Sequence, residues 1–197
     1  GHGDEYTIYS KTVKNILEQY APLIEQASID EFYLDMTGTQ RMYGSMFGFA
    51  TKLQKEIWDK IGLPISIGIG SNKTVAKIGS DCMKPKGITY IIPGMEKEFL
   101  APMPVETIPG VGKVMKQSLN SRGIYRIGDI TTIFSDFFGT AFGKYEIDLW
   151  RKAHGEGTEY LIIQRTRKSI SRETTFGNDV TSEEEIKNTL FSLTGEV

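Results

Sequence analysis

The sequence predicts an α+β protein in which a small sheet with helices on one face is followed by a purely helical region. Three observations predict it. Apolar residues recur at helical spacing in several segments, and short β-branched and aromatic runs lie between them. The strand-like runs stop near Pro104, whereas helical pieces continue to about residue 155. Hydrophobic residues make up 39% of the 197 residues, which is enough to bury a core.

The first half of the chain alternates helical and strand-like segments. One apolar helical face ends at Pro22 and consists of Tyr9, Val13, Ile16, Leu17 and Tyr20. The pattern then predicts strands over 23–29 and 32–36, a helix over 40–61, a strand over 64–70, a helix over 72–82 and a strand over 88–92. This α-β-β-α-β-α-β order is most of a split βαβ (ferredoxin-like) arrangement, with the helices on one face of an antiparallel sheet.

Shifts in composition predict the domain boundaries. Pro102-Met103-Pro104 separates a sheet-containing domain, 4–102, from helical pieces divided by glycines, 103–163. The basic run 164–168 is typical of a linker. Residues 169–197 begin with a strand-like alternation over 169–176 and continue as an amphipathic helix with acids in its first turn. About 30 residues are too few for a core of their own, so we expect this part to be truncated.

Composition excludes several classes of protein. A net charge of −2 excludes a uniformly basic nucleic-acid coat, and a single cysteine excludes a disulfide framework or a cysteine-based zinc cluster. We find no apolar stretch long enough to span a membrane and no signal peptide, so we expect a reduced, cytoplasmic protein. Positive charge nevertheless gathers in three stretches, 72–87, 109–128 and 164–172. Three basic stretches in one short chain favour binding to an extended polyanion.

Two adjacent carboxylates, Asp30 and Glu31, lie between the two predicted hairpin strands. If the turn brings them to one edge, they form a hard-oxygen site of the kind that Mg²⁺ takes together with substrate phosphates. The alternative is a solvated acidic turn, which is the commoner role of a bare Asp-Glu pair. Asp35 is a weaker candidate for a further acid.

Two lysine-containing turns are candidates for phosphate binding. Gly68 to Thr74 joins a strand to a helix, but Asn72 and Ile67 stand where a P-loop needs glycines, so we exclude a P-loop NTPase. Its alternative role is a helix N-cap at Ser71 or Asn72. Lys84, in Lys84-Pro85-Lys86-Gly87, is placed to hold a triphosphate as a point charge, with a surface turn as the alternative.

The segment Ile108-Pro109-Gly110-Val111-Gly112-Lys113 precedes an apolar helical pattern. Two glycines allow close approach of the backbone to a partner, and helix N-terminal amides then face outward beside Lys113 and Lys116. This is the helix-hairpin-helix way of holding a DNA phosphate, which reads no base sequence. A structural turn is the alternative.

With these pieces in order, the chain resembles the Y-family (DinB/UmuC-type) translesion DNA polymerases, and the DinB branch more than the UmuC branch. The matching stretches are Ser28 to Asp35, Gly68 to Lys73 with Ala76-Lys77, Lys84 to Gly87, Ile108 to Lys113 and Arg165 to Ser169. They occur in the family's order and cover nearly the whole chain.

The resemblance implies a role for each candidate. Asp30 and Glu31 are implied as metal-binding carboxylates for two Mg²⁺ ions, and Lys84 as the lysine on the incoming nucleotide. Residues 4–102 are implied as a partial palm, 103–163 as the thumb, 164–168 as the linker and 169–197 as the start of the little finger. DNA contacts are implied for Gly110, Val111, Gly112, Lys113, Lys116, Arg165, Arg167 and Lys168. The implied partners are primer-template DNA, deoxynucleoside triphosphates and, through a missing C-terminal part, a sliding clamp.

The sequence departs from the family at its start. Family members begin with a strand that carries a further metal-binding Asp, followed by a fingers domain, and nothing here precedes residue 4 to supply them. We therefore expect this stretch alone to be inactive, and its sheet to close up or to pair with another molecule. The alternative function is a non-enzymatic DNA-binding module with only a helix-hairpin-helix.

Overall fold

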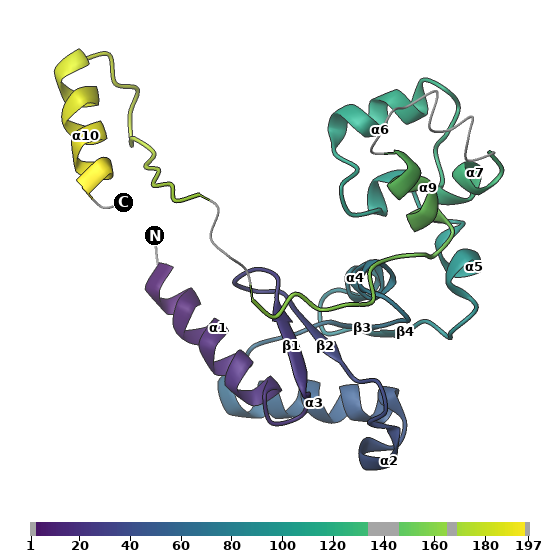
Figure 1. The fold of residues 1–197 in the computed structure, drawn as a ribbon. Coiled ribbons are helices and arrows are strands. Elements are labelled where there is room, and N and C mark those ends of the chain that lie inside the picture. The colour runs from purple at the N-terminus through teal and green to yellow at the C-terminus, as the bar shows by residue number, and fades with distance from the viewer. Residues whose placement is uncertain (1–2, 134–145, 165–168, 196–197) are drawn as a thin grey trace. The chain divides into compact units, whose positions relative to one another are not determined.

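The computed structural model describes residues 3–133, 146–164 and 169–195 (Figure 1). It divides into two compact units, Gly1–Ile163 and Gln164–Val197. Each unit is described by itself below. No helix in the described parts of the chain is both long and apolar enough to cross a membrane.

The first unit begins with the predicted mixture of helices and short strands. In chain order these are α1 (Gly3–Leu17), β1 (Leu23–Gln26), β2 (Phe32–Asp35), α2 (Gln40–Tyr43), α3 (Met46–Ile61), β3 (Ile67–Ile69), α4 (Lys73–Cys82) and β4 (Ile88–Tyr90). The α+β class is confirmed. The helix predicted over 40–61 is interrupted, because Gly44 has a φ of 71° and Ser45 caps a new helix by accepting a hydrogen bond from the Gly48 N–H.

The four strands form two separate pairs. β1 and β2 are antiparallel, with Glu25 opposite Tyr33, whereas β3 and β4 are parallel. The expectation of a single antiparallel sheet is therefore wrong for the second pair. Because α4 connects β3 to β4 as a crossover, it returns the chain to the starting edge and both strands run the same way.

Two hydrophobic cores hold the first unit together. One packs α1 and α3 against the β1–β2 pair, and its buried members are Val13, Ile16, Leu17, Phe49, Leu53 and Ile57. The other joins Val75 and Ile78 of α4 to buried residues of the helical region, among them Leu119 and Leu149. The second core thus continues across the predicted boundary at residue 103, so that α4 and the helical region share one interior.

In the described residues of the helical region lie α5 (Glu96–Leu100), a 3₁₀ turn (Val105–Thr107), α6 (Lys113–Asn120), α7 (Ile127–Thr131) and α9 (Glu146–Ala153). Asp129 caps the start of α7, where its carboxylate accepts hydrogen bonds from the N–H groups of Arg126 and Tyr125. Those hydrogen bonds lower the pKa of Asp129. After α9 the chain runs back beside α4 and β1 as an extended segment, residues 155–163, which we call the return segment (Figure 1).

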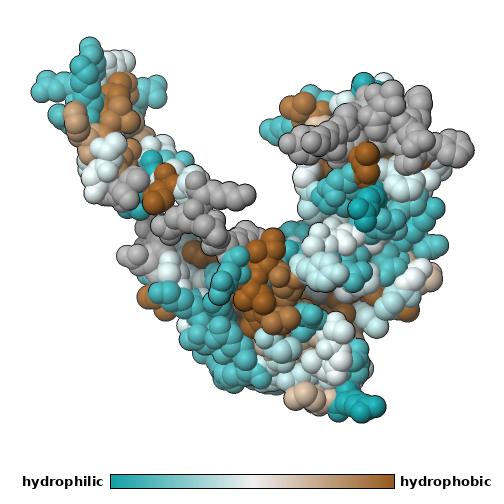
Figure 2. Space-filling view, in the orientation of Figure 1, coloured by the Kyte–Doolittle hydropathy of each residue, from teal (hydrophilic) through white to brown (hydrophobic). Residues whose placement is uncertain are grey.

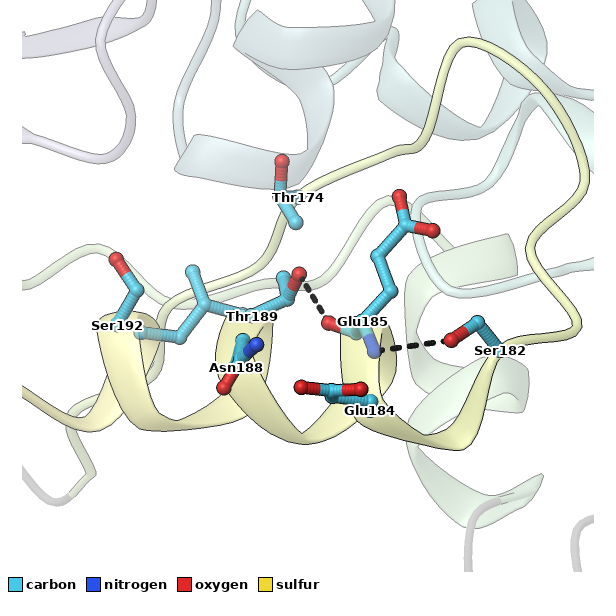
Figure 3. Close-up of a pocket in the computed structure, with 8 residues that line it drawn as sticks. Thr174, Ser182, Glu184, Glu185, Asn188, Thr189 and Ser192 are labelled. Atoms are coloured by element: carbon cyan, nitrogen blue, oxygen red, sulfur yellow. Dashed lines mark hydrogen bonds between the residues drawn. The ribbon is translucent and has the colours of Figure 1, made fainter.

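The second unit contains one described helix, α10 (Glu183–Gly195), whose first turn is capped by Ser182. The strand predicted over 169–176 is absent from the described residues of this unit, because no strand there pairs with it. A hollow of about 630 Å³ lies between Thr174 and α10 (Figure 3). Its lining is mostly polar and includes none of the predicted site residues.

Candidate active site and nucleic-acid interface

The turn between β1 and β2 holds the two predicted carboxylates. The Ala27 N–H donates to the Glu31 carbonyl at 2.9 Å and closes the turn. The Ser28 hydroxyl donates to Asp30 Oδ1 at 2.6 Å, while the Asp30 N–H donates to the same hydroxyl oxygen at 3.3 Å. Asp30 is thereby fixed at the exposed tip of the hairpin.

Glu31 is half-buried and held on both sides. The Tyr33 hydroxyl donates to Glu31 Oε1 at 2.6 Å, and Lys77 Nζ lies 2.6 Å from Oε2. Glu31 immediately precedes β2, and residues two apart in extended backbone point to the same face, which places Tyr33 beside Glu31. Lys77 reaches the hairpin from α4, so the two elements meet at this carboxylate.

The ion pair of Glu31 continues along α4 to Lys84. Lys77 also lies 3.5 Å from Asp81, one helical turn further on, and Asp81 in turn lies 2.6 Å from Lys84. We call these four residues (Glu31, Lys77, Asp81 and Lys84) the charge chain. The structure thus brings Glu31 and Lys84 to the two ends of one continuous network, while Asp30 lies next to it, bonded to Ser28.

The surroundings shift the pKa of Tyr33 and of two members of the charge chain, Lys77 and Asp81. Burial raises the pKa of Tyr33, and the hydrogen bond to Glu31 raises it further, so the phenol stays a neutral donor. Burial opposes the charge on Lys77, but Glu31 and Asp81 outweigh it and raise the pKa of Lys77. For Asp81 burial is likewise outweighed, because Lys84 and Lys77 lower its pKa. Lys77 and Asp81 are therefore charged at neutral pH.

The donor atoms at the hairpin are carboxylate oxygens, the type of ligand that Mg²⁺ prefers. Among the described residues, no group of three or more His, Cys, Asp or Glu side chains is placed to form a protein cage for a metal. Mg²⁺ does not need such a cage, because it commonly takes one or two carboxylates together with waters and substrate phosphates. A carboxylate oxygen that accepts one hydrogen bond also keeps a second lone pair. Asp30 and Glu31 therefore fit the ion.

The surface around the hairpin is partly apolar. Figure 2 shows an apolar patch in brown where the return segment crosses the β1–β2 hairpin, with polar side chains around it. Leu23 and Ile29 of the hairpin are exposed, as are Ile162 and Ile163 of the return segment. Contiguous apolar surface rimmed by polar groups is typical of a binding site.

Sequence reasoning assigned no role to Lys77, Asp81 or Tyr33. The i,i+4 spacing of Lys77 and Asp81 is a signal for an ion pair on a helix. Nothing local shows that Lys77 also faces Glu31, 46 positions earlier, because that contact depends on how α4 packs against the hairpin. The two-residue spacing of Glu31 and Tyr33 does predict, from the sequence alone, that both side chains lie on the same face.

The glycine turn before α4 serves packing and capping. Asn72 is the N-cap, and its side chain accepts a hydrogen bond from the Val75 N–H, as the alternative interpretation predicted. A Cβ on Gly68 would lie 1.9 Å from the Ala76 carbonyl oxygen. The glycine therefore allows β3 and α4 to touch.

The helix-hairpin-helix segment forms an exposed turn at the start of α6. Gly110 has a φ of 102°, which favours glycine, and Gly112 caps α6 without a side chain. Lys113 is exposed, whereas Lys116 pairs with Glu106 at 2.7 Å. The first N–H groups of a helix have no partner within it, so this end of α6 is suited to an anion. Three other predicted DNA contacts, Arg165, Arg167 and Lys168, lie outside the described residues.

Three family models match separate parts of the chain. The impB/mucB/samB family matches residues 2–81, the helix-hairpin-helix (HHH) motif of the IMS family matches 93–124, and the impB/mucB/samB family C-terminal domain matches 167–197. Together they match most of the sequence. The first range contains Asp30 and Glu31, and the second contains the turn from Gly110 to Lys113.

Curated relatives are named DNA polymerase IV. One from Streptococcus agalactiae is 37% identical over 187 residues, which cover 95% of this chain and 51% of the relative. One from Lactococcus lactis is 38% identical over 197 residues, which cover 100% of this chain and 54% of the relative. The chain spans about half the length of the curated relatives it matches.

Solved structures of Y-family proteins share the fold. DinB from Sulfolobus solfataricus has a TM-score of 0.72 at 31% identity and covers 81% of this chain and 48% of its own. A chimera of the Y-family polymerases Dbh and Dpo4 has a TM-score of 0.82 at 30% identity and covers 98% of this chain and 56% of its own. From its sequence models, its curated relatives and its fold, the chain belongs to the impB/mucB/samB family, as a DinB-type member of the Y-family DNA polymerases.

Proposed function

We propose that the full-length protein is a template-directed DNA polymerase of the translesion type, which transfers a nucleotide to a primer 3′-OH by two-metal catalysis. The observation that carries the proposal is the charge chain, because it connects a candidate metal-binding carboxylate, Glu31, to a candidate triphosphate-binding lysine, Lys84. Family membership and the names of the relatives support the same activity.

Each residue of the proposed site has a distinct task. Asp30 and Glu31 would hold Mg²⁺, which when bound stabilises the attacking and leaving oxygens of the transfer. Tyr33 and Lys77 hold Glu31 in place from opposite sides. The Lys84 side chain is 57% exposed, so it can exchange Asp81 for the phosphates of a nucleotide and neutralise part of their charge.

The proposed division of labour follows the predicted boundaries. Residues 4–102 act as the palm, 103–163 as the thumb, 164–168 as the linker and 169–197 as the start of the little finger. The turn at Gly110, Val111, Gly112 and Lys113, with Lys116 nearby, grips a DNA phosphate, and Arg165, Arg167 and Lys168 contact the backbone along the linker. Contacts to phosphates without base readout suit a polymerase that accepts any template. We also propose a sliding clamp as a further partner and a cytoplasmic location.

A primer-extension experiment tests the proposed activity. The full-length protein is mixed with Mg²⁺, a labelled primer-template and one deoxynucleoside triphosphate at a time, for each of the four template bases. We expect extension only with the complementary nucleotide. DNA binding without any extension would instead establish the alternative, a helix-hairpin-helix binding module.

The proposed DNA grip predicts a change in salt dependence. Lys113→Ala is expected to weaken binding to primer-template DNA uniformly across sequences, and to reduce the slope of log affinity against log salt by about 1. Lys55→Ala is the matched control, since this exposed lysine on α3 pairs with Asp59 far from the turn. Fluorescence anisotropy measures the Kd for DNA at several salt concentrations between about 50 and 200 mM, and the slope follows from these values. Equal slopes for the two variants would exclude Lys113 from the interface.

A further inference from the structure

Glu25 is a buried carboxylate that has no task in the catalytic site described above. It lies on β1 with none of its surface exposed. Its Oε2 lies 2.5 Å from Lys73 Nζ and also accepts a hydrogen bond from the Ile162 N–H at 2.8 Å. A buried ion pair commonly costs more in desolvation than it returns, so stability alone is a weak reason for placing a carboxylate here.

The partners of Glu25 come from two directions. Lys73 is the first residue of α4, and its backbone N–H donates to the Thr158 carbonyl at 3.1 Å. Ile162, like Thr158, belongs to the return segment. One step earlier, the Asn72 side-chain amide donates to the Gly155 carbonyl at 2.7 Å. Glu25 and the start of α4 therefore hold the return segment at several points.

The same pair leads to the proposed catalytic carboxylate. Lys73 Nζ lies 5.0 Å from the centre of the Tyr33 ring, a distance typical of a cation–π contact. Tyr33 stands opposite Glu25 in the β1–β2 ladder, and its hydroxyl donates to Glu31. Contacts thus run from Glu25 through Lys73 and Tyr33 to Glu31.

We propose that Glu25 is a positioning residue for the polymerase reaction: by fixing Lys73 over Tyr33, it holds Glu31 in the orientation that binds metal, and it ties this orientation to the docked return segment. This inference rests on the proposed function, because it takes Glu31 as a ligand of the catalytic metal. Groups that orient a metal ligand typically change metal affinity or activity 10- to 100-fold when removed.

Glu25→Gln tests the proposal because glutamine keeps the size of the side chain and an acceptor for Ile162 while removing the charge that holds Lys73. In single-turnover incorporation by the full-length protein, we expect the rate to fall at least about 10-fold and the half-saturating Mg²⁺ concentration to rise about 10-fold. The Kd for primer-template DNA stays unchanged. Glu18→Gln is the matched control, since this exposed glutamate pairs with Lys14 on α1.

The partner residue provides a second test. Lys73→Met is expected to lower the rate and raise the half-saturating Mg²⁺ concentration as Glu25→Gln does. The double variant should show no larger effect, because both changes break the same ion pair. Lys73→Arg keeps a cation over Tyr33 and restores the Mg²⁺ dependence. Wild-type Mg²⁺ dependence in both Glu25→Gln and Lys73→Met would overturn the proposal, since a merely structural pair would lower stability without moving this parameter.

Amide hydrogen exchange separates the failure of this inference from that of the proposed function. In Glu25→Gln we expect faster exchange both in the return segment and in the hairpin from residue 27 to 33. Faster exchange in the return segment alone would overturn the coupling. If the wild-type protein incorporates no nucleotide, the proposed function fails, and the exchange of the hairpin still decides whether Glu25 positions Glu31.

Discussion

Asp30→Asn is expected to reduce nucleotide incorporation by about 10³-fold, which corresponds to about 4 kcal/mol of transition-state stabilisation. The side chain keeps its size and its contact with Ser28, but it loses the negative charge that would hold a metal ion at the tip of the hairpin. Because the change is isosteric and exposed, the fold should be unaffected. Single-turnover incorporation at saturating Mg²⁺ and nucleotide measures the effect.

Asp35→Asn is the matched control for this change. Asp35 ends the other strand of the same hairpin, where its Oδ1 accepts a hydrogen bond from the Thr37 N–H at 2.9 Å. It takes no part in the charge chain, so we expect it to keep the wild-type rate. Equal rates for wild type and Asp30→Asn, with Asp30→Asn still folded and bound to DNA, would remove Asp30 from the catalytic site.

Gly68→Ala is expected to destabilise the first unit by about 3 kcal/mol, at the upper end of the range for overpacking. An added Cβ would lie 1.9 Å from the Ala76 carbonyl oxygen and 2.4 Å from the Ser80 amide nitrogen. Both are backbone atoms of α4, so no side-chain rotation relieves the clash and the helix itself must move from β3. Since α4 carries Lys77 and Asp81, the displacement should also break the charge chain.

Urea unfolding followed by circular dichroism measures the loss of stability. Thermal unfolding should show a fall in Tm of roughly 10 °C for a chain of this size. Gly112→Ala serves as the comparison, because an added Cβ at that position meets no atom within 4 Å. We expect that change to stay within about 0.5 kcal/mol of wild type. An unfolding midpoint for Gly68→Ala equal to that of Gly112→Ala would show that β3 and α4 are not in the contact described.

Local patterns predicted the helices and strands of the first unit well, because each depends on residues close in sequence. The apolar stripe of α3 is an example, since Phe49, Leu53 and Ile57 are buried as its spacing required. Gly44, which interrupts the predicted helix, was also readable in the sequence. The direction of β4 relative to β3 was not, because it depends on how the α4 crossover packs.

The sequence predicted the two ends of the charge chain, Glu31 and Lys84, but not the two residues that connect them. Motifs singled out Asp30, Glu31 and Lys84, whereas Lys77 and Asp81 connect two of them only once α4 lies against the hairpin. Glu25 gave no signal at all, since an acid in a short strand is ordinarily exposed. Its burial follows from Lys73 and Ile162, which are 48 and 137 positions away.

The alternating signs along the charge chain have a consequence for ligand selection. In the resting protein each carboxylate already has an internal counter-ion, and each amine has one too. The two carboxylates and two amines of the chain sum to zero charge, so a lone cation at Glu31 or a lone anion at Lys84 would add charge that no neighbour in the chain balances. A metal-bound triphosphate carries both signs. Under the proposed function its metal can use the second lone pairs of Glu31 while Lys77 stays in place, and its phosphates can replace Asp81 at Lys84, so the network favours that composite ligand over either of its components.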